Sequence, residues 1–165
     1  MEVVAGVDLA VKRPSAIALF SGCDLVAYAS ALGVEDLVNA LRVFRPAAVA
    51  IDAPLSKPSG GHLRDVEVEL RRLGYRLLPP LLGGMAQLTE RGIELARALG
   101  NAIEVHPRTS MAAMEISAGY IKSRYKPPTA DHLDAVAAAL TALSYLAGKY
   151  KRIGPFILPL ENPCT

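Results

Sequence analysis

The sequence predicts an α/β fold in which a three-stranded antiparallel meander is extended into a mixed five-stranded sheet with helices on both faces. Three strand-like segments with short connections open the chain, and helix-like and strand-like segments then alternate. The 165 residues are 52% hydrophobic and 21% charged, which excludes a disordered chain. This length favours one domain over residues 1–165, with a C-terminal tail at about 148–165.

The meander is predicted from three apolar segments near the start of the chain. Residues 3–9 (VVAGVDL) form a near-continuous apolar run typical of a buried strand, and Pro14 then interrupts the chain. Residues 15–20 form the second strand-like segment. Ser21-Gly22 marks a turn, and residues 24–31 form the third segment.

Helices and strands are predicted to alternate after the meander. The spacing of Leu37, Leu41 and Phe44 indicates a helix that ends at Pro46, and residues 47–51 follow as a buried strand. The remaining predicted segments are helices over 63–73, 85–99, 110–116 and 131–147, a strand over 102–106, loops over 54–62 and 117–130, and a strand-like piece within 153–160.

Cysteine usage and hydropathy restrict the class of protein. Cys23 and Cys164 do not form a CxxC pair, which excludes a zinc ribbon. We expect two idle thiols, and the alternative is a disulfide that ties down the C-terminus. Asn and Gln total only four, a thermophile-like scarcity that gives the disulfide some weight. No apolar run reaches the ~18 residues of a membrane span, and no signal-peptide pattern opens the chain, so we expect a soluble cytoplasmic protein.

Three aspartates stand beside buried apolar segments. Asp8 lies in the first strand, Asp52 ends the fourth, and Asp134 lies in the first turns of the last long helix. Burying several carboxylates together is costly unless a cation joins them, and Mg²⁺ or Mn²⁺ prefers oxygen ligands. Two such ions about 4 Å apart catalyse phosphodiester hydrolysis. We therefore expect a catalytic metal site here, although each aspartate could instead start a turn or a helix.

Three further residues are candidates for the same site. Asp131, one helical turn before Asp134, is either another metal ligand or a first-turn acid favoured by the helix dipole. Glu104 and His106 alternate with apolar neighbours and so share one sheet face. Glu104 is either an extra catalytic carboxylate or part of a structural polar pair. His106 is either a proton carrier or phosphate contact, or the other member of that pair.

The charge distribution favours a polyanionic partner. The net charge is +2, and it becomes +6 when the four aspartates are set aside, because 18 basic residues then face 12 acidic ones. Lys122, Arg124 and Lys126, interleaved with two tyrosines, are the best candidates for contacts with nucleic acid. Arg64, which shares one predicted helix and its exit with Arg71, Arg72 and Arg76, is a further candidate. The alternatives are a solvated loop and an ion-paired helix face.

The motifs resemble a known superfamily. GVDLA, VAIDAP and DHLDAVAAAL stand where ribonuclease H-like proteins carry their acids, and the last segment looks like the final helix of RuvC-type resolvases. More closely, the chain resembles domain-of-unknown-function family 429, a group of predicted nucleases, over most of residues 3–147. The motifs that carry this resemblance are GVDLA, AIDAPLS, RDVEVELRRLG, GGMAQLTERGIEL, IEVHPRTS and DHLDAVAAALTAL.

The resemblance implies that Asp8, Asp52 and Asp134 bind the metal. The helix after the third strand offers no clear catalytic glutamate, since Glu35 stands too near its start, and the fourth ligand stays unassigned. We therefore expect a Mg²⁺- or Mn²⁺-dependent nuclease acting on DNA or RNA, with no membrane partner. An oligomer such as a dimer is compatible with the sequence.

Two other functions belong to proteins with this predicted fold. One is a non-catalytic nucleic-acid-binding or scaffold protein with the same fold. The other is a sugar-kinase- or actin-like phosphotransferase, which is disfavoured because no glycine occurs in the LAVKRPS segment after Asp8 and no second lobe fits the length.

Overall fold

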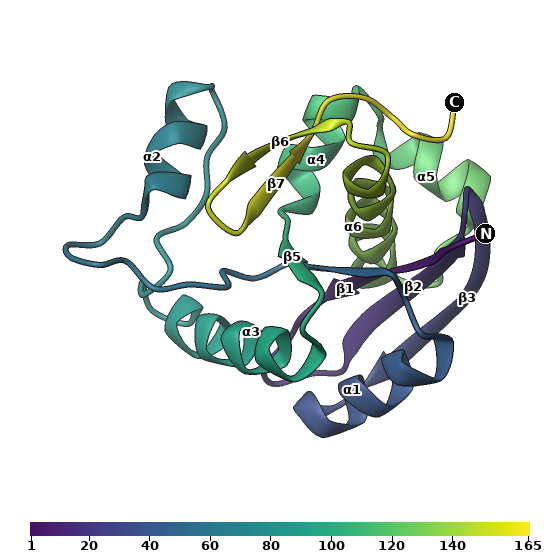
Figure 1. The fold of residues 1–165 in the computed structure, drawn as a ribbon, viewed down its shortest axis with the longest axis horizontal. Helices are drawn as coiled ribbons and strands as arrows, with labels where there is room; N and C mark the ends of the chain where they lie inside the picture. The colour runs from purple at the N-terminus through teal and green to yellow at the C-terminus, as the bar shows by residue number, and fades with distance from the viewer.

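The first three strands form the predicted antiparallel meander, and the rest of the sheet is built outward from β1. The computed structural model describes all 165 residues. The seven strands stand in the order β3-β2-β1-β4-β5-β7-β6. Figure 1 shows the meander of β1, β2 and β3 at one end of the sheet and β6 and β7 at the other. Their bounds are β1 Val3–Asp8, β2 Ser15–Ser21, β3 Asp24–Ala31, β4 Ala48–Ile51, β5 Ala102–Glu104, β6 Tyr150–Ile153 and β7 Phe156–Pro159.

Strand direction divides the sheet into an antiparallel meander (β1 to β3), a parallel centre (β1, β4, β5 and β7) and an antiparallel hairpin (β6 and β7). β1 pairs antiparallel with β2 but parallel with β4, and β5 runs parallel to both β4 and β7. The predicted mixed sheet with helices on both faces is therefore confirmed. The sheet is larger by two strands than the five predicted, because the tail forms the β6–β7 hairpin. Only one residue pair, Glu104 with Phe156, joins this hairpin to β5.

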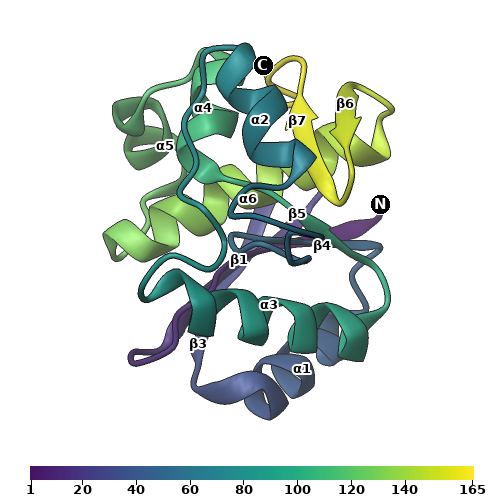
Figure 2. The same cartoon turned by 90° about the vertical axis from the view of Figure 1, so that its left-hand side faces the viewer.

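Six helices cover the two faces of the sheet. Their bounds are α1 Gly33–Phe44, α2 Asp65–Arg72, α3 Met85–Leu99, α4 Pro107–Met114, α5 Ala118–Tyr125 and α6 Ala130–Leu146. Figure 2 shows α1 and α3 on one side of the sheet and α4, α5 and α6 on the other. α2 packs near the hairpin, where Val66 and Leu70 contact Ile153 and Phe156. None of the helices combines the length and hydropathy that crossing a bilayer requires.

The predicted loop over residues 117–130 is wrong for its first half, which forms α5. The Ser117 hydroxyl oxygen accepts a 3.0 Å hydrogen bond from the backbone N–H of Tyr120, which caps the helix. Ile121 and Tyr125 are buried against α6, so two long-range contacts stabilise a helix of eight residues that has little amphipathic pattern of its own.

Gly6 determines how closely α6 lies on the sheet. A Cβ atom at Gly6 would stand 2.0 Å from the carbonyl oxygen of Ala135 and 2.4 Å from the backbone nitrogen of Ala139. The helix backbone therefore rests directly on β1, which requires glycine below and small residues above. This close approach brings Asp134, the neighbour of Ala135, toward the end of β1.

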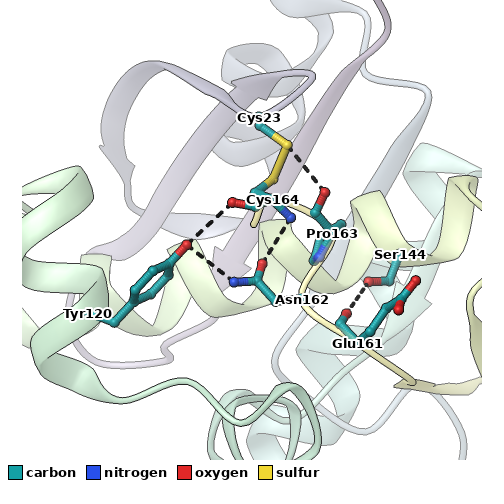
Figure 3. The surroundings of a disulfide bond; sticks show 7 residues. All are labelled: Cys23, Tyr120, Ser144, Glu161, Asn162, Pro163 and Cys164. Carbon is teal, nitrogen blue, oxygen red and sulfur yellow. Dashed lines mark hydrogen bonds between the residues drawn. A yellow bond between two sulfur atoms is a disulfide. The ribbon is translucent and has the colours of Figure 1, made fainter.

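Cys23 and Cys164 form a disulfide, which corrects the expectation of idle thiols. The bond joins the β2–β3 turn to the last residues of the chain, across a sequence separation of 141 (Figure 3). Asn162 supports the tail there, because its side-chain amide donates to the Tyr120 hydroxyl at 3.2 Å and its carbonyl oxygen accepts from the Cys164 N–H at 3.0 Å.

Candidate metal centre

Three carboxylates from three elements converge at the carboxyl ends of β1 and β4. Val7 and Ile51 are register partners in the parallel pair, so Asp8 and Asp52 are the next residues on neighbouring strands. The Asp52 N–H donates to the Val7 carbonyl oxygen at 2.9 Å, which extends the pairing into the site. Asp134 reaches the same point from the second turn of α6. One carboxylate oxygen from each residue lies within 4.8 Å of the others.

The electrostatics of this acid cluster (Asp8, Asp52 and Asp134) disfavour three negative charges. Burial, reinforced by the charges of Asp52, Asp131 and Asp134, raises the pKa of Asp8 to about 8. Burial and the charge of Asp134 raise the pKa of Asp52 to about 7. The pKa of Asp134 is also raised, first by burial and then by Asp131. A positive ion among the three would remove this cost.

The donor set fits a hard divalent cation. All three donors are carboxylates on strand ends and a helix, and no cysteine or histidine is among them. Oxygen-only sites with few protein ligands suit Mg²⁺ or Mn²⁺ and leave room for water and phosphate, whereas structural zinc takes sulfur and nitrogen.

Asp131 stands beside the acid cluster but outside it. Its Oδ2 accepts from the Arg13 Nε at 2.9 Å, and this hydrogen bond is the main reason that its pKa is lowered. Both side chains are partly exposed. The aspartate therefore has a cation of its own at the rim of the site.

Glu104 belongs to a buried ion-pair network rather than to the acid cluster. Its two oxygens accept from the two terminal nitrogens of Arg64, each at 2.7 Å, and Oε1 also accepts from the Leu55 N–H at 2.8 Å. Arg64 binds Glu67 as well, and burial raises the pKa of Glu104 despite the arginine. The network ties the start of α2 and the segment after Asp52 to β5.

This network corrects the prediction that Arg64 contacts nucleic acid, and it shows what surrounds Glu104. Arg64 is ion-paired with Glu67 on its own helix, as the alternative interpretation expected, but it is only 7% exposed and so is not available to nucleic acid. Both oxygens of Glu104 are engaged by Arg64, and the catalytic role expected of this glutamate stays a prediction. The 40 residues that separate these partners gave no local signal of the pairing.

His106 lies near the acid cluster, at the N-terminus of α4. Its Nδ1 is 2.7 Å from the Thr109 hydroxyl oxygen. Burial, with a smaller effect of the Arg108 charge, lowers its pKa. Together with Asp52 it lines a cavity of about 200 Å³ whose other walls are largely apolar.

Lys122, Arg124 and Lys126 lie away from this region. All three are exposed on or just after α5. The Arg124 guanidinium lies 5.5 Å from the Tyr125 ring centroid and 6.0 Å from that of Tyr120, so it stacks on its own helix. None of the three lines any of the three main cavities that contain Asp52.

Two larger clefts meet at Asp52 and Asp134. One, of about 710 Å³, is lined by Asp8, Lys12 and Arg13 among others. The other, of about 1200 Å³, opens between the end of α2 and the start of α4. The sequence did not single out Lys12 or Arg108, because an isolated basic residue carries no periodic signal. It groups Arg71 and Arg76 of the second cleft with Arg64 as part of an ion-paired helix face.

The sheet order, the three-stranded meander and the acids at the ends of β1 and β4 define a ribonuclease H-like α/β fold. No family model matches the chain, and no curated protein matches its sequence. Among solved structures, the chain is similar to T. thermophilus RuvC in complex with Holliday junction substrate, with 16% identity and a TM-score of 0.57. The match covers 97% of this chain and 100% of the RuvC chain. The fold is thus RuvC-like, whereas the closer resemblance to domain-of-unknown-function family 429 is not confirmed.

Proposed function

We propose that the protein is a divalent-metal-dependent nuclease that hydrolyses phosphodiester bonds of DNA or RNA at the acid cluster. The observation that carries this proposal is the convergence of Asp8, Asp52 and Asp134, from two strands and a helix, within 4.8 Å. The RuvC-like fold supports it, since the similar RuvC structure holds a nucleic-acid substrate.

The residues of the chain have distinct parts in this proposal. Asp8, Asp52 and Asp134 would hold Mg²⁺ or Mn²⁺, which supplies an activated water and polarises the phosphate when bound. Arg13 keeps Asp131 ionised at the rim. His106 has Nδ1 engaged by Thr109, so its Nε2 is the ring nitrogen left for a proton or a phosphate oxygen.

The test begins with calorimetric titration of Mn²⁺ into the wild type and Asp8→Asn. We expect saturable binding that the substitution abolishes. Cleavage of labelled duplex DNA, four-way DNA junctions and RNA is then assayed with Mg²⁺ or Mn²⁺, and Asp134→Asn is expected to be inactive. A matched control is Asp36→Asn, which changes an exposed aspartate on α1.

The second candidate is a non-catalytic nucleic-acid-binding protein. The observation that favours it is the small number of carboxylates left to bind a metal ion, because Asp131 is paired with Arg13 and Glu104 with Arg64. Nucleic-acid binding without Mn²⁺ binding or cleavage would select this alternative and overturn the nuclease proposal.

A further inference from the structure

The larger cleft that leaves the acid cluster carries three arginines. Arg71 at the end of α2, Arg76 in the following segment and Arg108 in the first turn of α4 line it, and Asp52 and Asp134 are at its inner end. We call this cleft the arginine groove. Arg71 and Arg76 are five residues apart, whereas Arg108 follows Arg76 by 32 residues, and the fold brings all three to one cleft.

The charges in the arginine groove are unpaired. Arg71, Arg76 and Arg108 are exposed, and none of them forms an ion pair with a carboxylate. Arg72, the neighbour of Arg71, is instead bound to Glu69. Unpaired guanidinium groups that share a cleft repel one another, and a bound anion would relieve this repulsion.

The groove and the acid cluster are electrostatically complementary and adjacent. Arg108 is near enough to Asp134 for its positive charge to favour the ionised carboxylate. This effect on the pKa of Asp134 is smaller than the opposite effect of burial. The volume of about 1200 Å³ exceeds that of a typical small-molecule pocket, which suits a segment of polymer.

We propose that the arginine groove binds the phosphate backbone of the nucleic-acid strand on one side of the bond cleaved at the acid cluster. This inference rests on the proposed function and adds the path of the strand. It differs from the path expected from the sequence, because Lys122, Arg124 and Lys126 line none of the three main cavities that contain Asp52.

The experiment compares two triple variants that remove the same charge. One carries Arg71→Gln, Arg76→Gln and Arg108→Gln. The other carries Lys122→Gln, Arg124→Gln and Lys126→Gln. Each changes the formal net charge from +2 to −1, because three positive charges are lost. Fluorescence anisotropy measures the binding of a fluorescein-labelled four-way DNA junction in EDTA, over a series of salt concentrations.

We expect the groove variant to bind at least tenfold more weakly than the wild type at low salt. The slope of log affinity against log salt should fall by about two to three, because each lost phosphate contact removes about 0.7–0.9. The α5 variant should lose much less. Equal losses in the two variants, or wild-type binding by the groove variant, would overturn the proposal. If the groove variant does not fold, Arg108→Gln alone should reduce the slope by about one.

Mn²⁺ titration separates this proposal from the proposed function. The groove variant should bind Mn²⁺ like the wild type, because its substitutions leave the acid cluster intact. If the wild type binds Mn²⁺ and cleaves DNA while the groove variant binds DNA normally, the groove proposal fails and the nuclease proposal stands. If the wild type does not bind the junction in EDTA, the groove proposal fails, and Mn²⁺ binding with cleavage decides the proposed function separately.

Discussion

Single carboxylates of the acid cluster determine how the stability of the metal-free protein depends on pH. The folded-state pKa values of Asp8 and Asp52, about 8 and about 7, lie above the ordinary value of 3.8. The folded protein thus retains protons that the unfolded chain has released. This contribution to stability is complete below about pH 4 and is lost as pH rises through 7 to 8.

We therefore predict that the melting temperature of the metal-free protein falls between pH 5 and pH 8 and that Mn²⁺ restores it. Asp52→Asn should flatten this decline and raise the free energy of unfolding at pH 8 by about 1–3 kcal/mol, because it removes a half-buried charge. Differential scanning calorimetry over a pH series measures both effects. A melting temperature that rises over this interval would contradict the prediction, and Asp36→Asn is the control for loss of a surface aspartate.

Arg64 is the residue whose loss should be most damaging to the fold. We predict that Arg64→Ala lowers the free energy of unfolding by about 3–5 kcal/mol, since it leaves Glu67 and Glu104 buried without their cation. Arg64→Lys should recover only part of this loss, because an ammonium group cannot bind both carboxylates as a planar guanidinium does. Urea denaturation measures the effect.

The control for Arg64 is Arg72→Ala, one of the exposed positions of the same helix. Its ion pair with Glu69 is in solvent, so little change in stability is expected. A comparable loss in both variants would show that α2 is sensitive to any arginine substitution and that the buried network has no special weight.

At the scale of elements, the contact between α6 and β1 connects stability to the site. Gly6→Ala would force the helix backbone away from the sheet, because the added methyl group would overlap the Ala135 carbonyl group and the Ala139 N–H. We predict a loss of at least about 3 kcal/mol in unfolding free energy. Mn²⁺ affinity should also fall at least tenfold, because Asp134 moves with the helix.

Chemical denaturation and Mn²⁺ calorimetry measure these two effects of Gly6→Ala. Gly60→Ala provides the control, because a Cβ atom at Gly60 meets nothing within 4 Å. Wild-type stability and Mn²⁺ affinity in Gly6→Ala would mean that the helix is free to shift without cost.

The elements that could be predicted from the sequence are those with a strong period or a long apolar run. β1, β2 and β4 are buried along nearly their whole length, and α3 spans the predicted residues 85–99. α5 and β6 were not predicted, because each is stabilised by contacts with elements distant in the sequence, whereas the strand-like piece within 153–160 corresponds to β7. The acid cluster was predictable because each aspartate follows or opens an apolar segment.

The long-range partners of charged residues could not be predicted in the same way. Arg13 and Asp131 are 118 residues apart, and Arg64 and Glu104 are 40 apart. Local spacing holds no information about such pairs, so the sequence alone left Asp131 and Glu104 open as metal ligands. The sequence groups Arg71 with Arg76, but local spacing does not show that Arg108 lines the same groove.

At the scale of the whole molecule, the disulfide should affect stability without affecting the acid cluster. It connects the β2–β3 turn with the C-terminus, and Gly22 beside it bonds to Glu2 just before β1. Asp8 is at the opposite end of β1. The two ends of this strand, Val3 and Asp8, are roughly 17 Å apart at about 3.3 Å per residue. Cross-linking residues 141 apart restricts the unfolded chain strongly.

We predict that the paired substitution Cys23→Ser and Cys164→Ser lowers the free energy of unfolding by about 2–5 kcal/mol. Reductant should lower the melting temperature of the wild type and leave that of the double variant unchanged. Mn²⁺ affinity, measured by calorimetry below the melting transition, should stay at the wild-type value in both cases, because the sheet end that holds Asp8 and Asp52 keeps its hydrogen bonds. Weaker Mn²⁺ binding at unchanged stability would instead show that the C-terminal tail positions the acid cluster through α6, on which Ser144 bonds to the Glu161 carbonyl oxygen at 3.1 Å.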